Sequence, residues 1–293
     1  MSSRFLIINA DDFGVCPATN DAIEQIFNEG ILSSTTLMTP CAAAENAIQR
    51  VRSNPKIRMG LHITTTSEWA CKWGPVAPLE SVKTIADRDG HMYAAVKEFA
   101  EHANSVEVAA EMEAQYQFMK TRGVPPTHAD SHMGSLYGLT GVSFMKETLE
   151  FCAEKKLAFR FPKNITGAKG IIRIETLPEP LAAMHKQALV YAKILGVPLI
   201  DNLFTSTAAF SDLTSYEKLQ HVYFDIIDNL PEGISEIYMH PSLEYSPFAK
   251  DNPDRWRVRI WEHRLLLDIS FRKHIESEDI MLVNYQTAPF GKA

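Results

Sequence analysis

Short apolar runs alternate with segments of helical periodicity along most of the chain, and this alternation limits the possible folds more than any other feature. The apolar runs predict buried strands at residues 4–10, 34–39, 57–64, 127–132, 157–161, 170–174, 197–204, 235–239 and 280–283. Apolar side chains recur at helical spacing in residues 20–29, 42–52, 104–123, 142–152, 181–195, 216–230 and 257–274. Such alternation predicts a parallel sheet with helical crossovers. Seven or eight repeats favour a barrel-like α/β fold related to the TIM barrel.

The chain of 293 residues contains no linker, internal repeat or low-complexity segment, which predicts one domain over residues 1–293. Its least regular part is residues 65–103, which contain Trp69 and Trp73. A connection of this length is uncommon in a compact domain unless it has a function. We therefore expect a loop insertion there that partly covers a functional site as a lid.

The composition argues against several classes of partner. Formal net charge is −7, whereas proteins that bind nucleic acid usually present a basic face. No run of about 18 apolar residues predicts a membrane-spanning helix, and the first residues do not resemble a signal peptide. The four cysteines form no C-x-x-C pair, so neither a disulfide framework nor a thiolate zinc site is expected. We expect a cytoplasmic protein without nucleic-acid or membrane partners, with a symmetric homodimer as the default oligomer.

Polar side chains cluster at the ends of predicted strands. In a β/α barrel these positions share one rim, where active sites are built. Adjacent residues of an extended strand point to opposite faces, so the first two members of this set reach one site only if the chain turns there. The set comprises Asp11, Asp12, His62, His128, Asp130, His132 and His240.

These residue types indicate metal-assisted hydrolysis. A carboxylate with two imidazoles suits zinc, iron, manganese or cobalt and leaves positions open for water or substrate. A second carboxylate supplies a general base and a histidine across the rim supplies an acid. Taken singly the signals are weak, since Asp11 or Asp12 could cap a helix and His62 could be an ordinary buried histidine. The Asp12-Phe13-Gly14 tripeptide is not a kinase motif, because no glycine-rich loop or H-R-D precedes it.

The motifs, taken in order, resemble those of the YdjC-like carbohydrate deacetylases, which include the chitooligosaccharide deacetylases. The resemblance covers nearly the whole chain and rests on Asn9-Ala10-Asp11-Asp12-Phe13-Gly14, Gly60-Leu61-His62, Thr127-His128-Ala129-Asp130-Ser131-His132 and His240-Pro241. It implies a barrel-like α/β fold, a divalent metal that is often magnesium, and hydrolysis of an N-acetyl group from a sugar such as a chitooligosaccharide. The ligand types alone would equally suit zinc.

The resemblance also implies a role for each matching residue. Asp12, His62 and His132 are expected as metal ligands, Asp11 as general base and His240 as the acid that protonates the leaving amine. Asp130 is expected to orient a ligand, and His128 to lie beside it or near substrate. Arg160 matches a family arginine and is expected to hold substrate or to pair with a carboxylate.

One departure keeps other interpretations open. The family usually continues as H-x-D-S-H-x-H, whereas this chain has Gly134 at the last position. A sugar-binding protein of the same fold with impaired catalysis is therefore an alternative. A non-haem iron oxygenase is a further one, although such sites usually occur in all-β folds. Sugar rings could stack on aromatic side chains near the rim, for which the candidates are Trp69, Trp73, Tyr93 and Tyr245.

Overall fold

The computed structural model describes residues 3–68, 71–165 and 178–291. Within these residues, eight strands form one entirely parallel sheet with the order β5-β4-β3-β2-β1-β7-β6, while β8 pairs with β1. The strands are β1 (Arg4–Phe13), β2 (Ser34–Leu37), β3 (Met59–Ile63), β4 (His128–Ser131), β5 (Ala158–Phe159), β6 (Asn202–Phe204), β7 (Gly233–Met239) and β8 (Ile280–Leu282).

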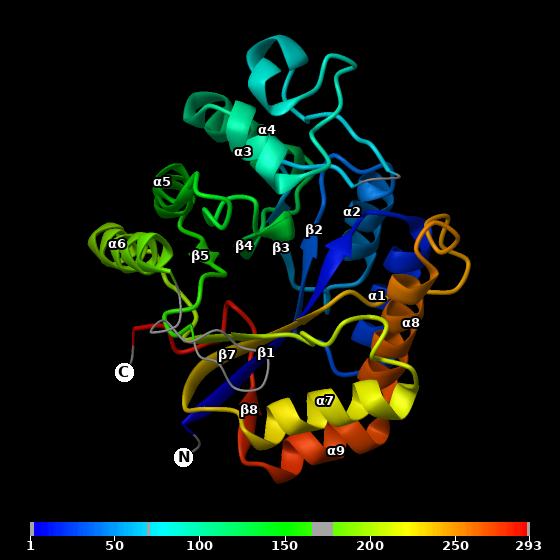
Figure 1. The fold of residues 1–293 in the computed structure, drawn as a ribbon. Coiled ribbons are helices and arrows are strands. Elements are labelled where there is room, and N and C mark those ends of the chain that lie inside the picture. Colours follow the sequence, from blue (N-terminus) through cyan, green and yellow to red (C-terminus); the bar gives the residue numbers. More distant parts are fainter. Residues whose placement is uncertain (1–2, 69–70, 166–177, 292–293) are drawn as a thin grey trace.

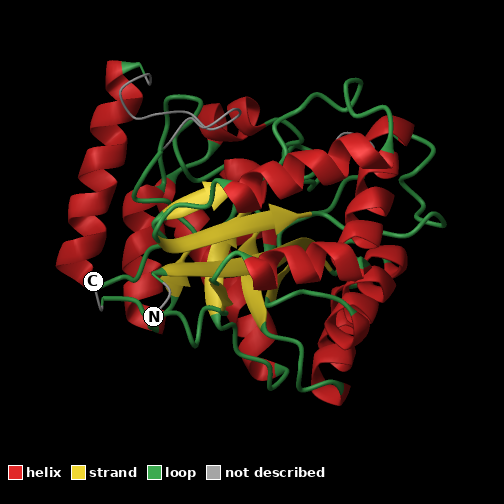
Figure 2. Ribbon diagram, turned by 90° about the horizontal axis from the view of Figure 1, so that it is seen from below, coloured by secondary structure: helices red, strands yellow, loops and turns green. Residues whose placement is uncertain are grey.

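The sheet is curled so far that its two edges meet. Phe159 of β5 forms a parallel bridge with Leu199, just before β6, and its amide donates to the carbonyl of Pro198 at 2.9 Å. Figure 1 shows the strands surrounded by helices, and Figure 2 shows the same arrangement from below. The expectation of a barrel-like α/β fold is therefore confirmed.

Helices cover the outside of the sheet. The described ones are α1 (Pro17–Glu29), α2 (Ala44–Ser53), α3 (Val96–His102), α4 (Ser105–Thr121), α5 (Met145–Lys155), α6 (Glu179–Leu195), α7 (Tyr216–Asp228), α8 (Pro253–Leu267) and α9 (Ile269–Ser277), with short 3-10 turns η1 (Leu79–Ser81), η2 (Lys83–Ile85) and η3 (His132–Gly134). None of these helices combines the length and apolar character needed to cross a membrane.

The prediction of one helix over residues 257–274 is wrong, because the helix is interrupted at Asp268. This residue is extended, with φ −72° and ψ 119°, and its side chain accepts a hydrogen bond from the amide of Ser270. It thus caps α9 and separates it from α8. The strand predicted at 170–174 lies outside the described residues.

Residues 65–103 are held to the barrel by one face of α4. Glu111, fully buried, accepts hydrogen bonds from the amides of Val76 and Ala77, both at 2.9 Å. One turn later, Gln115 donates to the carbonyl of Thr64. Hydrogen bonds to α4 therefore fix the insertion at its start and again at Val76 and Ala77. The insertion contains η1, η2 and α3.

Candidate active site

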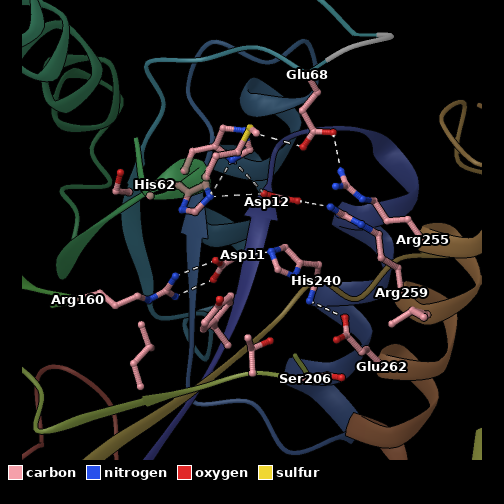
Figure 3. Close-up of a pocket in the computed structure, with 18 of the residues that line it drawn as sticks. Asp11, Asp12, His62, Glu68, Arg160, Ser206, His240, Arg255, Arg259 and Glu262 are labelled. Carbon is pink, nitrogen blue, oxygen red and sulfur yellow. Dashed lines mark hydrogen bonds and ion pairs between the residues drawn. The ribbon is translucent and has the colours of Figure 1, made fainter. Parts of the chain in front are cut away.

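The predicted site residues meet at the carboxyl ends of the parallel strands. A cavity of about 420 Å³ is lined there by Asp11, Asp12, His62, His132, Arg160 and His240 (Figure 3). These side chains come from β1, β3, η3 and the segments that follow β5 and β7. Asp130 lies directly behind this wall, fully buried.

A bulge at the end of β1 allows two adjacent aspartates to line one cavity. The register of β1 with β2 shifts between Ala10 and Phe13, and Asp12 has φ +65°. Aspartate is among the few residues that accept this left-handed conformation readily. In an extended strand Asp11 and Asp12 would point to opposite faces, and the local turn instead directs both side chains into the cavity.

The rest of the Asn9–Gly14 motif supports this turn. Asn9 donates to Asp11 Oδ1 at 2.8 Å and accepts a hydrogen bond from Ser34 at 2.5 Å. Gly14 has φ +92°, and a Cβ placed there would lie 2.8 Å from Leu37. Only glycine therefore fits the end of the motif without a local shift.

Three ligand atoms meet in a small triangle. His62 Nε2 lies 3.5 Å from Asp12 Oδ1, while His132 Nδ1 lies 3.7 Å from that oxygen and 3.2 Å from His62 Nε2. The centre of such a triangle is about 2 Å from each corner, the distance at which zinc holds nitrogen and oxygen. Among the described residues, buried Asp12 Oδ1 has no hydrogen-bond partner. The three side chains therefore fit a divalent cation.

Asp130 fixes the ring of His62. The Nδ1 atom of His62 lies 2.6 Å from Asp130 Oδ1, so this nitrogen carries a proton and Nε2 is the ring atom that faces the triangle. Burial disfavours the charged imidazole, but Asp130, Asp12 and Asp11 together raise the pKa of His62 to about 10. Burial and the nearby His62 lower the pKa of His132 to about 3. A neutral His132 is the form that binds metal.

Arg160 donates hydrogen bonds to both carboxylate oxygens of Asp11. Its Nη1 and Nη2 atoms each donate to Asp11 at 2.7 Å, and Nη1 also lies 2.8 Å from Asp130 Oδ2. Burial alone would raise the pKa of Asp11, but Arg160, with smaller effects of His62 and His240, lowers it to about 2. Asp11 is therefore ionised across the neutral range. Of the two roles expected for Arg160, the structure shows the pairing with a carboxylate.

His240 stands beside Asp11 at the open side of the cavity. Its Nε2 lies 3.9 Å from Asp11 Oδ2, and its side chain is 33% exposed, so a molecule in the cavity can touch it. The backbone amide of His240 donates to Glu262 at 2.8 Å, and the same carboxylate accepts a hydrogen bond from Tyr223 at 2.7 Å. Glu262 thereby fixes the start of the segment after β7.

Two residues of α8 belong to the site and were not predicted from the sequence. Arg259 donates to Asp12 Oδ2 at 2.7 Å, and Glu262 holds the backbone of His240. Burial opposes ionisation of Asp12, yet Arg259 keeps the pKa of that carboxyl well below its usual range. The two side chains lie three positions apart on the buried face of α8 together with Trp256. Two charged residues three positions apart on an otherwise apolar helix face were the sequence signal that could have identified Arg259 and Glu262 as buried site residues.

The insertion borders the cavity through Glu68. Its Oε1 lies 3.9 Å from His132 Nε2, and its Oε2 lies 3.3 Å from Nη1 of Arg255 on α8. The ring of Trp73 lies 6.1 Å from that of His132. Trp73 is therefore at the same end of the barrel as the candidate metal ligands Asp12, His62 and His132, as a lid requires. Trp69 lies outside the described residues.

Other predicted residues lie elsewhere. His128 faces the barrel interior below the cavity, where its ring stacks on Tyr285 at 3.7 Å between centroids. Tyr93 stacks on His102, and the hydroxyl of Tyr245 contacts Asp21, so neither lines the cavity. The cavity-lining aromatic side chains among the described residues are Tyr137, Phe210 and Tyr238. Gly134 has φ +62° and also lines the cavity.

Comparisons with known proteins agree with this picture. A family model described as YdjC-like protein matches residues 5–277. A carbohydrate deacetylase of Enterococcus faecalis is 37% identical over 98% of this chain and 99% of its own length. A chitooligosaccharide deacetylase of Yersinia enterocolitica is 33% identical over 58% of this chain and 64% of that protein. A crystal structure from Enterococcus faecalis, described as a cellobiose-phosphate cleavage protein, superposes with a TM-score of 0.77 at 25% identity and covers 98% of this chain and 99% of its own.

Proposed function

This chain belongs to the YdjC-like family, and we propose that it is a metal-dependent hydrolase that removes the acetyl group from N-acetylated oligosaccharides such as chitooligosaccharides. The observation that carries the proposal is the triangle of Asp12, His62 and His132 beside an ionised Asp11. Support also comes from the relatives named as carbohydrate deacetylases, one of which aligns over almost its whole length.

The chain's own residues then divide the work. Asp11, held by Arg160, accepts the proton of the attacking water, and His240 beside it donates a proton to the amine that leaves. The low pKa of Asp11 keeps it ionised but makes it a weak base. A divalent ion held by the triangle would supply the missing driving force, since it polarises the acetamide carbonyl and acidifies water.

The triangle accommodates more than one metal. Two imidazoles and one carboxylate are a donor set typical of zinc and of iron, manganese and cobalt, whereas magnesium prefers oxygen ligands. Magnesium is the ion that the family resemblance implies. We propose a divalent cation at this position and expect zinc and magnesium to be the two ions worth comparing first.

Two alternatives differ in what they predict. A catalytically impaired sugar-binding protein would bind the same oligosaccharides without releasing acetate. A non-haem iron oxygenase would consume dioxygen, and the α/β fold weighs against it because such triads usually occur in all-β folds. No observation of the site favours either one over hydrolysis.

The decisive experiment is acetate release from a panel of N-acetylated di- and trisaccharides, unphosphorylated and phosphorylated. Each substrate is tested with metal-free protein and after addition of zinc or magnesium. Acetate release that disappears with a chelator and returns with one metal supports the proposal. Tight sugar binding without acetate release under any metal condition contradicts it.

A further inference from the structure

Behind Asp11, a buried line of polar side chains crosses the barrel to the C-terminal segment. Arg160, which binds both oxygens of Asp11, also donates its Nε to Glu236 Oε1 at 2.7 Å. The other oxygen of Glu236 accepts a hydrogen bond from the hydroxyl of Tyr285. Glu236 is fully buried and the other three side chains are at most 5% exposed. Four residues from β1, the end of β5, β7 and the segment after β8 thus form one connected set.

Tyr285 cannot touch a substrate. It does not line the cavity, and it belongs to a buried apolar cluster with Ile7, Ile200, Ile234 and Val283. Its ring is held flat against His128, with an angle of 9° between the planes. The phenol is therefore rigid, and only its hydroxyl is directed toward the polar interior.

Glu236 depends on both of its partners. Burial raises its pKa to about 7, against the opposing effects of Arg160 and of the hydrogen bond from Tyr285. Without the hydroxyl of Tyr285, Oε2 of Glu236 would lose its hydrogen bond. The carboxyl group would then be free to rotate or to take up a proton. Arg160 would then lose a fixed anchor on the side opposite Asp11.

We infer that Tyr285 is a positioning residue of the active site, which fixes the carboxylate of Asp11 through Glu236 and Arg160. The inference rests on the proposed function, in which Asp11 accepts a proton. It gives the segment after β8 a part in turnover, although none of the described residues of that segment lines the cavity. Because Asp11 acts on the reacting water rather than on the bound sugar, loosening it should slow turnover and leave substrate affinity unchanged.

The test is Tyr285→Phe, which keeps the ring stacked on His128 and removes only the hydroxyl. We expect kcat to fall about tenfold, the usual worth of a hydrogen bond to a charged group, with KM within about twofold and unchanged metal content. The matched control is Tyr216→Phe, which removes another buried phenol hydroxyl, 2.9 Å from Asp268 and outside the cavity. Its kcat should stay within about twofold of wild type.

A double-variant cycle with Glu236→Gln separates positioning from general loosening. Since Tyr285 acts through Glu236, its substitution should have little further effect on kcat in the Glu236→Gln background. An unchanged kcat in Tyr285→Phe, or an undiminished effect in that background, overturns the inference while wild-type acetate release leaves the proposed function standing. A wild type that releases no acetate overturns both. Should Tyr285→Phe not fold, Glu236→Gln alone decides, because a loss confined to KM or to thermal stability contradicts the positioning role.

Discussion

Replacing Asp12 by asparagine tests the metal site with little disturbance of the backbone. Asp12 has φ +65°, which asparagine adopts nearly as readily as aspartate, whereas alanine would add strain. The two side chains also have nearly the same size and shape. The difference between wild type and variant therefore comes from the lost negative charge.

The structure gives two separate magnitudes. Arg259 lies 2.7 Å from Asp12 and both side chains are less than a tenth exposed, so removing the charge should lower the free energy of unfolding by about 3 kcal/mol even without metal. For a chain of this length that corresponds to a Tm about 5 °C lower. In wild type, a metal at about 100 times its Kd adds about 2.7 kcal/mol, or about 4 °C. The variant should show no such gain, because an amide oxygen is a poorer ligand.

The assay is thermal unfolding in chelator and at graded concentrations of zinc and magnesium, with metal content measured on the same samples. Asp11→Asn serves as the matched control, since it removes the adjacent charge and its ion pair with Arg160. It should lose stability but keep the metal-dependent rise in Tm. If instead Asp11→Asn abolishes that rise and Asp12→Asn keeps it, the ligand has been assigned to the wrong aspartate.

Three further predictions concern turnover, pH and packing. Asp11→Asn should keep its metal and lower kcat by about 10² to 10⁴, the usual worth of a positioned base, and a loss below about twofold in acetate release would refute that role. Burial raises the pKa of Glu236 from 4.5 to about 7, so its contribution to stability is present below pH 4.5 and is lost as pH rises through 7. In denaturant titrations, the unfolding free energy of wild type should fall by about 3 kcal/mol relative to that of Glu236→Gln between pH 4.5 and 7. If the difference between the two proteins stays constant with pH, the raised pKa of Glu236 is refuted. Gly60→Ala should cost about 1–3 kcal/mol in the same titrations, because its Cβ would lie 2.5 Å from the ring of His128, and unchanged stability would show that the ring moves aside.

The gathering of site residues was predictable because it follows from topology. Parallel strands bring their carboxyl ends to one rim, so Asp11, His62, His132 and His240 had to approach once the alternation was recognised. The rotation of Asp12 was not predictable from this rule. It depends on one positive φ and a shifted register, which the apolar pattern does not encode.

The partners of the aspartates were predicted only in part. Arg160 was recognised from its motif, but Arg259 and Glu262 were not, because the predicted helix ran from 257 to 274 through the cap at Asp268. A single helix over that range combines two helices with different buried faces, which hides the charged positions of α8. The placement of Tyr93 and Tyr245 outside the cavity has a different reason, since sequence does not show whether an aromatic ring packs on a neighbour or faces a cavity.

The two arginines explain how adjacent buried aspartates can do different work. Two neighbouring carboxylates would normally raise each other's pKa, and one of them would take up a proton. Here each has its own cation from a distant part of the chain, and the pKa of both is lowered. Arg160 occupies both oxygens of Asp11, whereas Arg259 occupies only Oδ2 of Asp12 and leaves Oδ1 directed at His62 and His132. The number of oxygens that each arginine engages therefore supports the proposed division, with Asp12 as ligand and Asp11 as base.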